Sequence, residues 1–238
     1  MSTFHPRTIR CPACGATTTR MIAVSINGPR RPDVVDAAKA GVFQRFTCTQ
    51  CGAGYQVDHP MVYLDFEKGL WIAMYPARWE QSWRHYENEP RDDWRRNMIV
   101  NAPPLVRSMS GKFRIRAVFG LDALGDKLAC LDGGLDDVFL ELLKLDLMRS
   151  TQGLVFHPAR RPRLREIHPD RLVFFVAGGA DGATPPHSME VPRSRYAALA
   201  ANAVEWAAGM EAVSGGPYID VGRALIPGDA EPDEDWAA

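Results

Sequence analysis

The distribution of apolar and polar side chains predicts strands in the first third of the chain. Residues 61–66 and 70–75 each alternate between two sets of side chains with a period of two. That period is typical of a strand with two different faces, and residues 67–69, which end in glycine, supply a turn between the runs. We therefore expect a hairpin with one aliphatic and one more aromatic face. Residues 17–26 and 42–47 are rich in β-branched and aromatic side chains and predict two further strands.

Later segments change to the period of a helix. Leucines recur at every third or fourth position from residue 121 to 131, and a second apolar series follows Gly133 and Gly134. This spacing places the apolar side chains on one face of each helix. The patterns predict helices over residues 33–39, 121–131, 135–143 and 196–206 and strands over residues 113–119, 164–167 and 172–176.

Shifts in composition divide the chain into four parts and predict an α+β protein. Residues 1–76 form a β-rich part, residues 77–110 an aromatic and arginine-rich helical connector, and residues 111–226 a second α+β part. Residues 227–238 are acidic and contain one large apolar side chain, that of Trp236. Such a segment buries too little surface to offset the entropy of ordering it, so we expect a disordered tail.

Two cysteine pairs carry the clearest chemistry. Cys11 and Cys14, like Cys48 and Cys51, are separated by two residues and followed by glycine. Two intervening residues let a tight turn point both sulfurs at one ion, and the glycine permits the positive φ that brings backbone N–H groups near the sulfurs. The repeated pattern predicts one four-thiolate metal site. We expect a zinc-ribbon-like part with a short helix inserted between the pairs.

The donor set favours zinc over iron. Four thiolates hold either metal, but a closed four-cysteine site has no open position for a water or a substrate, so its expected role is structural. A redox thiol pair at Cys11 and Cys14 is the rival hypothesis, and it leaves the second pair without a purpose. The fifth cysteine, Cys130, is predicted to lie on the polar side of its helix as a free thiol.

An aromatic and basic segment follows the β-rich part. Trp79, Trp83 and Tyr86 lie at helical spacing and therefore share one face. Packing of that face against the predicted hairpin is one interpretation. The other is a surface that binds a protein partner, or stacks on the bases of a nucleic acid. The candidate partner-binding residues are Trp79, Trp83, Arg84, Trp94 and Arg95.

The charge distribution gives weak support for nucleic-acid binding. The formal net charge is −1, but five acidic residues lie among the last ten positions, which leaves a mildly basic body. Dedicated nucleic-acid binders usually show a denser basic surface.

The sequence has no apolar run long enough for a membrane span and no secretory signal, and its cysteines suit a reducing compartment, so we expect a cytoplasmic protein with no membrane partner.

The cysteine motifs resemble those of the CpXC protein family, which is named for its Cys-Pro-x-Cys sequence. The resemblance extends to the glycine and aromatic strand of residues 41–48, to Tyr63-Leu64-Asp65, and to residues 134–144 and 216–221, and so covers most of residues 8–226. One departure is Thr49, where many members have proline. The resemblance implies an architecture and supplies no activity.

The sequence leaves three functions open. The first is a binding or adaptor module with an unidentified protein partner. The second is an enzyme whose site lies between the two main parts, and the third is a nucleic-acid-binding protein that uses the tryptophan and arginine segment. A cleft that gathers arginines and carboxylates with shifted pKa values would favour the enzyme, whereas an exposed apolar patch without such a cleft would favour the adaptor.

Overall fold

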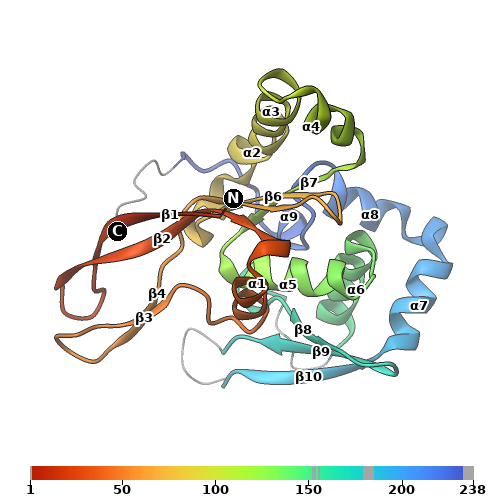
Figure 1. Cartoon of the computed structure of the whole chain (residues 1–238). Coiled ribbons are helices and arrows are strands. Elements are labelled where there is room, and N and C mark those ends of the chain that lie inside the picture. The colour runs from red at the N-terminus through yellow and green to blue at the C-terminus, as the bar shows by residue number, and fades with distance from the viewer. Residues whose placement is uncertain (1, 152–153, 155, 179–184, 233–238) are drawn as a thin grey trace.

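The computed structural model describes residues 2–151, 154, 156–178 and 185–232, and its strands form three sheets (Figure 1). The largest sheet has five strands in the order β1-β2-β5-β6-β7. In it, β1 and β2 pair antiparallel, as do β5 and β6, whereas β2 with β5 and β6 with β7 are parallel. The bounds are β1 Thr3–Arg10, β2 Thr17–Asn27, β5 Met61–Asp65, β6 Leu70–Tyr75 and β7 Arg114–Phe119.

Two smaller sheets complete the strands. An antiparallel sheet in the order β10-β9-β8 contains β8 Arg163–Ile167, β9 Arg171–Val176 and β10 His187–Pro192. An antiparallel pair consists of β3 Arg45–Thr47 and β4 Gly54–Gln56. The predicted hairpin around residues 164–176 is thereby confirmed.

The helices lie on both sides of the five-stranded sheet. Figure 1 shows α2 to α4 on one side and α1 and α5 on the other, with the three-stranded sheet beyond them. The α-helices are α1 Pro32–Lys39, α2 Trp83–Tyr86, α3 Glu89–Arg95, α4 Pro104–Met109, α5 Leu121–Asp132, α6 Asp137–Ser150, α7 Arg193–Ala201, α8 Ala207–Ser214 and α9 Gly222–Leu225. In the described part of the chain the longest, α6, has 14 residues, fewer than the ~20 that a membrane span requires.

Two apolar cores lie on either side of the α5 and α6 layer. The first joins α1 and α5 to one face of the large sheet, where Leu124 and Leu128 pack with Ile72 of the central strand β6. The second joins α6 to the three-stranded sheet and includes Leu142 and Phe174. The predicted leucine faces of both helices are therefore the surfaces on which the layers pack.

The other face of the large sheet carries an aromatic cluster. Trp79 and Tyr86 stack with ring centroids 4.8 Å apart, and Tyr75 from β6 lies 5.2 Å from Tyr86. Trp83 contacts Tyr218, which comes from the C-terminal part of the chain. Ala117 of β7 also forms a parallel bridge with Tyr218. Residues near 218 thus extend the fold that residues 1–119 begin.

The hairpin of β5 and β6 is confirmed, but its faces differ from those expected. Asp65 pairs with Leu70, so four residues lie between the paired positions. Odd-numbered residues of β5 therefore lie opposite even-numbered residues of β6, as Tyr63 does opposite Ile72. Even-numbered residues of β5 lie opposite odd-numbered ones, as Leu64 does opposite Trp71. Each face consequently mixes aliphatic and aromatic side chains, and β6 is buried along its whole length.

Three further differences from the predicted elements concern the ends of a strand and a helix and two edge strands. The strand expected over residues 42–47 is shortened to β3, because Gln44 adopts a φ of +52° and uses its side chain to bridge Ala23 N–H and the Val57 carbonyl. The helix expected over residues 196–206 ends at Ala201, where the Asn202 side chain donates to the Ala198 carbonyl. The apolar pattern also gave no sign of β1 or β10, which are edge strands with polar and proline residues.

The predicted division into parts stays a prediction, and the large sheet includes strands from both sides of it. Strand β7, from the predicted 111–226 part, pairs along its whole length with β6, from the predicted 1–76 part. The connector packs beside them through the aromatic cluster.

The beginning of the C-terminal tail is held in place, in contrast to the disorder expected from sequence. Residues 228–231 lie against the segment 81–84: Arg84 N–H donates to the Gly228 carbonyl, Ala230 N–H to the Gln81 carbonyl, and the Ser82 hydroxyl to the Glu231 carbonyl. Gly228 has a φ of +78° and sits so close to the Trp83 indole that a Cβ would overlap it. Residues 233–238, the rest of the predicted tail, lie outside the described residues.

Truncation after Pro227 is therefore expected to lower the melting temperature by roughly 6–12 °C. Each lost hydrogen bond contributes about 1 kcal/mol, and 1 kcal/mol shifts the midpoint of a chain of this size by about 2–4 °C. Truncation after Pro232 keeps all three bonds and is the matched control, which should melt with the full chain in a calorimetric scan. Equal melting temperatures for the two truncated proteins would show that residues 228–232 add nothing to stability.

Candidate metal centre and adjoining groove

Two hairpins position the four predicted metal ligands. Cys11 and Cys14 lie in the loop between β1 and β2, and Cys48 and Cys51 lie in the loop between β3 and β4. The two loops share one hydrogen-bond pattern. The backbone carbonyl of the first cysteine accepts from the N–H of the glycine four residues later, and the N–H of that cysteine donates to the carbonyl of the alanine five residues later. The two glycines have φ angles of +74° and +72°, as the motif predicts. Each loop is thus a tight turn that presents both of its thiols on one side.

The sulfur geometry fits one tetrahedral metal ion. Cys11 Sγ lies 3.8 Å from Cys51 Sγ, and Cys14 Sγ lies 3.7 Å from Cys48 Sγ. All four sulfur atoms lie within 4.8 Å of one another. A metal at about 2.3 Å from each of four thiolates requires sulfur separations of about 3.8 Å. All four thiols are free of disulfides, so the arrangement is compatible with a four-cysteine metal site.

The protons of these thiols are distributed unevenly. The backbone N–H groups of Cys51 and Gln50 lower the pKa of Cys48 to about 6. The Ala16 N–H acts to lower the pKa of Cys14, but the Cys51 thiol, burial and the other two thiols outweigh it and raise that pKa to about 12. Four crowded sulfurs cannot all ionise without a cation, so binding a divalent metal would displace protons.

A small apolar core supports the inner half of the cluster. Cys11 and Cys48 are buried with Ile22, Tyr55 and Val57, whereas Cys14 and Cys51 are exposed. The loops are further joined by Arg20 of β2, which donates to the Thr47 carbonyl at 3.1 Å. The candidate centre therefore lies where the two hairpins meet over a small shared apolar core.

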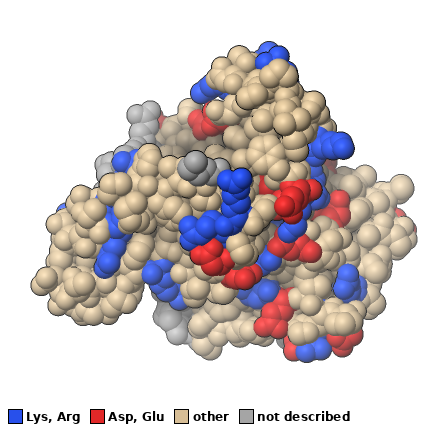
Figure 2. Space-filling model, in the orientation of Figure 1, with Lys and Arg blue, Asp and Glu red and all other residues tan. Residues whose placement is uncertain are grey.

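The hairpins that carry the cysteines are basic. Residues 2–27 and 42–57 contain Arg7, Arg10, Arg20 and Arg45 and no aspartate or glutamate. On the face shown in Figure 2, the end of the molecule that carries these hairpins displays basic side chains and no acidic ones. This end of the protein is thus suited to an anionic partner.

A groove runs from the metal cluster toward the centre of the protein. Its outer part, about 720 Å³, is lined by Cys11 together with Arg10, Tyr55 and Arg78. Its inner part, about 260 Å³, continues past Asp58 between the sheet and the 3₁₀ segments Ala77–Ser82 and Pro158–Arg160. The Asp58 carboxylate accepts backbone N–H bonds from Ala77 and Leu121, and burial raises its pKa.

The predicted partner-binding residues do not form one exposed surface. Trp79 and Trp83 are buried in the aromatic cluster, and the Trp83 indole donates to the Ile226 carbonyl. Arg84 is exposed, lies over the Trp83 ring at 4.7 Å and donates to the Pro227 carbonyl. Trp94 is half-buried and Arg95 is exposed on α3. The packing interpretation of Trp79 and Trp83 fits this arrangement, and a role in partner binding stays a prediction.

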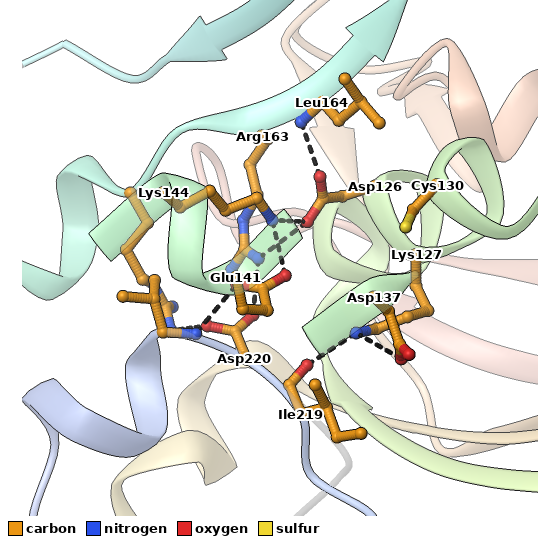
Figure 3. A network of polar contacts seen from close by, with 12 residues as sticks. Asp126, Lys127, Cys130, Asp137, Glu141, Lys144, Arg163, Leu164, Ile219 and Asp220 are labelled. Atoms are coloured by element: carbon orange, nitrogen blue, oxygen red, sulfur yellow. Dashed lines mark hydrogen bonds and ion pairs between the residues drawn. The ribbon is translucent and has the colours of Figure 1, made fainter. Parts of the chain in front are cut away.

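A buried ion network occupies the interior between the two sheets (Figure 3). At its centre Lys144 of α6, with no exposed surface, pairs with Asp126 of α5 and, at 2.8 Å, with Glu141. The other Asp126 oxygen accepts from Leu164 N–H of β8 at 2.6 Å, and the second Glu141 oxygen accepts from Val221 N–H. These bonds connect α5, α6, β8 and the segment near residue 221.

The network continues toward the inner groove. Asp220 accepts from Arg163 at 2.7 Å and from Arg161 at 2.9 Å. Burial alone would raise the pKa of Asp220, but Arg163 and Arg161 outweigh it and lower that pKa. Arg161 also donates to Glu80 at 2.6 Å, and Glu80 accepts from the Tyr218 hydroxyl. The groove therefore ends on charges that already have partners.

A second branch of the network joins α5, α6 and β7 near Cys130. Lys127 pairs with Asp137 at 3.1 Å and donates to the Ile219 carbonyl at 2.7 Å, and Arg116 of β7 pairs with Asp137 at 2.7 Å. Cys130 is fully buried beside this branch, which corrects the polar position predicted for it, and burial raises the pKa of its thiol. The prediction was wrong because α5 is packed on nearly all sides.

Sequence reasoning missed this network, although the sequence contains a signal for it. Asp126 and Lys127 interrupt the leucines of α5, and Glu141 and Lys144 interrupt those of α6. A helix that is apolar on most sides can hold charges only if they are paired. The full set has equal numbers of acids and bases: Glu80, Asp126, Asp137, Glu141 and Asp220 with Arg116, Lys127, Lys144, Arg161 and Arg163.

Comparison with models of protein families matches residues 9–144 to the family described as CpXC protein. The match includes all four clustered cysteines and both of the charged helices, α5 and the first half of α6. No curated protein and no solved structure matches the chain.

Proposed function

The chain belongs to the CpXC protein family, and from that premise we propose that it is a zinc-stabilised module that binds a protein partner. The observation that carries the proposal is the cluster of four sulfur atoms next to a basic groove. Zinc in this site has a structural role: four thiolates complete its coordination and leave no position for a substrate. The paired turns at the ends of two hairpins support the zinc-ribbon comparison, and cysteines free of disulfides suit a reducing compartment such as the cytoplasm.

The outer groove is the proposed partner site. Arg10 and Arg78 are exposed at its walls, and Pro12 and Ala77 supply exposed apolar surface. This combination suits an acidic peptide segment with apolar side chains. Among the described residues that line the outer groove, Tyr55 is the aromatic one, and it is buried, so no exposed ring is offered to a nucleic-acid base. This favours a protein over a nucleic acid.

Binding of a labelled hexaglutamate peptide tests the site. We expect saturable binding that weakens at least fivefold in Arg10→Gln and in Arg78→Gln, because each change removes a cation at the groove wall, and that weakens with added salt. Fluorescence anisotropy measures the affinity. The metal content of each protein is measured in parallel, so that loss of binding is distinguished from loss of the metal.

Arg149→Gln is the matched control, since Arg149 is exposed on α6 and does not line the groove. Its affinity should equal that of the unchanged protein. Equal binding of hexaglutamine and hexaglutamate would contradict the proposal. Tighter binding of a twelve-residue oligothymidine than of hexaglutamate would favour the nucleic-acid function instead.

The enzyme hypothesis is the second candidate, and the inner groove is the observation that favours it. Asp58, with its raised pKa, and the arginines 161 and 163 line a cleft of the expected kind. Against it, Asp58 caps two backbone N–H groups, and Arg161 is bound by Glu80 and Asp220. Charges committed to the fold in this way are poorly placed to act on a substrate, so we favour the binding function.

A further inference from the structure

A second groove lies on the face of the large sheet that carries the aromatic cluster, and we call it the aromatic groove. Its volume is about 470 Å³, and it runs between β5, β6 and residues 79–93. It shares no lining residue with the groove beside the metal cluster. The volume is in the range of sites that hold small ligands or short peptide segments.

Aromatic and aliphatic side chains form its walls. Tyr75, Trp79 and Tyr86 line one side as part of the aromatic cluster, with centroids 4.8 to 6.2 Å apart. Val62 and Ala73, which are paired across β5 and β6, line another. Such walls accept an apolar chain, and the electron-rich faces of aromatic rings attract a cation.

Two carboxylates lie at one end of the aromatic groove. Glu89 and Asp93 are four residues apart on α3, so both project from the same side of the helix. Glu89 accepts the Tyr75 hydroxyl at 3.0 Å. Burial, followed by the Glu89 charge, raises the pKa of Tyr75, so this hydroxyl keeps its proton and fixes the carboxylate in place.

The surrounding charges leave this end acidic. Asp93 pairs with Arg96 at 3.5 Å, and both side chains are largely exposed, so the pair is weak and a ligand can displace it. His85 also lines the groove and is exposed. Among the described residues, Glu89 and Asp93 are thus balanced only by the weakly held Arg96.

An unpaired donor provides an independent indication of a ligand. Trp79 is 8% exposed, and its indole N–H has no acceptor among the described residues. A buried donor without an acceptor costs about 1–3 kcal/mol. The Nε1 atom is itself covered by neighbouring atoms, so a ligand acceptor that reaches it, and removes this cost, must displace some of them. The other tryptophans with unpaired indoles, Trp71 and Trp94, do not line the groove.

We propose that the aromatic groove binds a lysine or arginine side chain of a polypeptide partner. The cationic end lies at Glu89 and Asp93, the aliphatic stem lies along the apolar walls, and a backbone carbonyl accepts from Trp79. A peptide supplies all three groups on one chain, whereas a free amine supplies only the first two. The volume of the groove exceeds what a single ammonium group fills. This site is independent of the acidic partner proposed for the other groove.

Titration with short peptides tests the proposal. The probe is acetyl-Ala-Ala-Lys-Ala-Ala-amide, and the comparison peptide has norleucine in place of lysine. We expect saturable binding by calorimetry, with the lysine peptide at least tenfold tighter. Asp93→Asn and Glu89→Gln should each weaken the lysine peptide at least fivefold and leave the norleucine peptide unchanged, since only the charge is removed.

The matched control is Asp92→Asn, because Asp92 is exposed on the same helix but does not line the groove. Thermal melting of each variant separates loss of binding from loss of folding. Equal affinity for the lysine and norleucine peptides, no saturable binding of either, or an equal effect of Asp92→Asn would overturn the proposal. Binding of n-butylamine as tight as that of the lysine peptide would overturn the assignment to a polypeptide.

Discussion

Replacing Cys48 with serine is expected to remove the metal and to unfold the β3–β4 hairpin in the same step. The change takes away one of four soft ligands, and the remaining three cannot complete a structural zinc shell. In zinc-finger peptides the apparent binding free energy is about 10–16 kcal/mol and is coupled to folding, which far exceeds what two three-residue strands gain by pairing. Elemental analysis should fall from one zinc per chain to none, and amide exchange should accelerate over residues 45–57.

Cys130→Ala is the control for this experiment. Cys130 is buried beside the ion network and lies in a different core from the cluster, so its removal should leave the metal content unchanged. A full equivalent of zinc retained by Cys48→Ser would exclude Cys48 as a ligand. Iron with visible thiolate absorption would replace zinc in the proposal. A metal-free, folded protein with a disulfide between Cys11 and Cys14 would favour redox chemistry.

Replacing Lys144 with methionine is expected to destabilise the protein by about 3–5 kcal/mol. Methionine fills a similar volume, but it leaves Asp126 and Glu141 buried without their shared cation, and a buried charge that loses its partner carries a cost of this size. Urea unfolding measures the change. Lys68→Met is the matched control: Lys68 pairs with Asp132 but is 45% exposed, so its loss should cost under about 1 kcal/mol.

The Lys144→Met deficit should also depend on pH. Burial raises the pKa of Glu141 even with Lys144 present, and loss of that cation removes an influence that lowers it. A carboxyl group whose pKa is higher in the folded protein binds protons there more tightly, so folding gains stability as the pH falls. The deficit relative to the unchanged protein should therefore be smaller at pH 5 than at pH 8. A variant as stable as the original at both values would show that Asp126 and Glu141 do not need the Lys144 cation.

The parts of the fold that sequence predicts well are those that local residues determine. The cysteine turns were predicted with their glycine conformation, because both follow from five consecutive residues. The leucine faces of α5 and α6 follow from helical spacing, and the family match agrees with the resemblance seen in the motifs. In each case the determining residues lie within a few positions of one another.

The missed features depend on residues that are distant in the chain. Glu80 and Arg161 are 81 positions apart, and nothing in the sequence near either residue predicts that the two side chains pair. The register of β5 with β6 depends on the loop length, which the apolar pattern alone does not set. The interior position of Cys130 depends on elements that pack around it from the second half of the chain. The contacts of Trp83 with Tyr218 and Ile226 likewise join residues that are far apart in the chain.

The contacts made by residues 218–231 have a consequence for the order of events during biosynthesis. Trp83 is covered by Ile226 and Gly228, and β7 gains its outer neighbour at Tyr218, so the aromatic face of the large sheet is incomplete until these residues leave the ribosome. Contacts across about 140 positions close slowly because a long loop must form first. The two cysteine hairpins and the small core beneath them need only residues 3–57. The candidate metal site can therefore form early, whereas the aromatic side chains of residues 75–86 stay exposed until residues 218–231 have been synthesised.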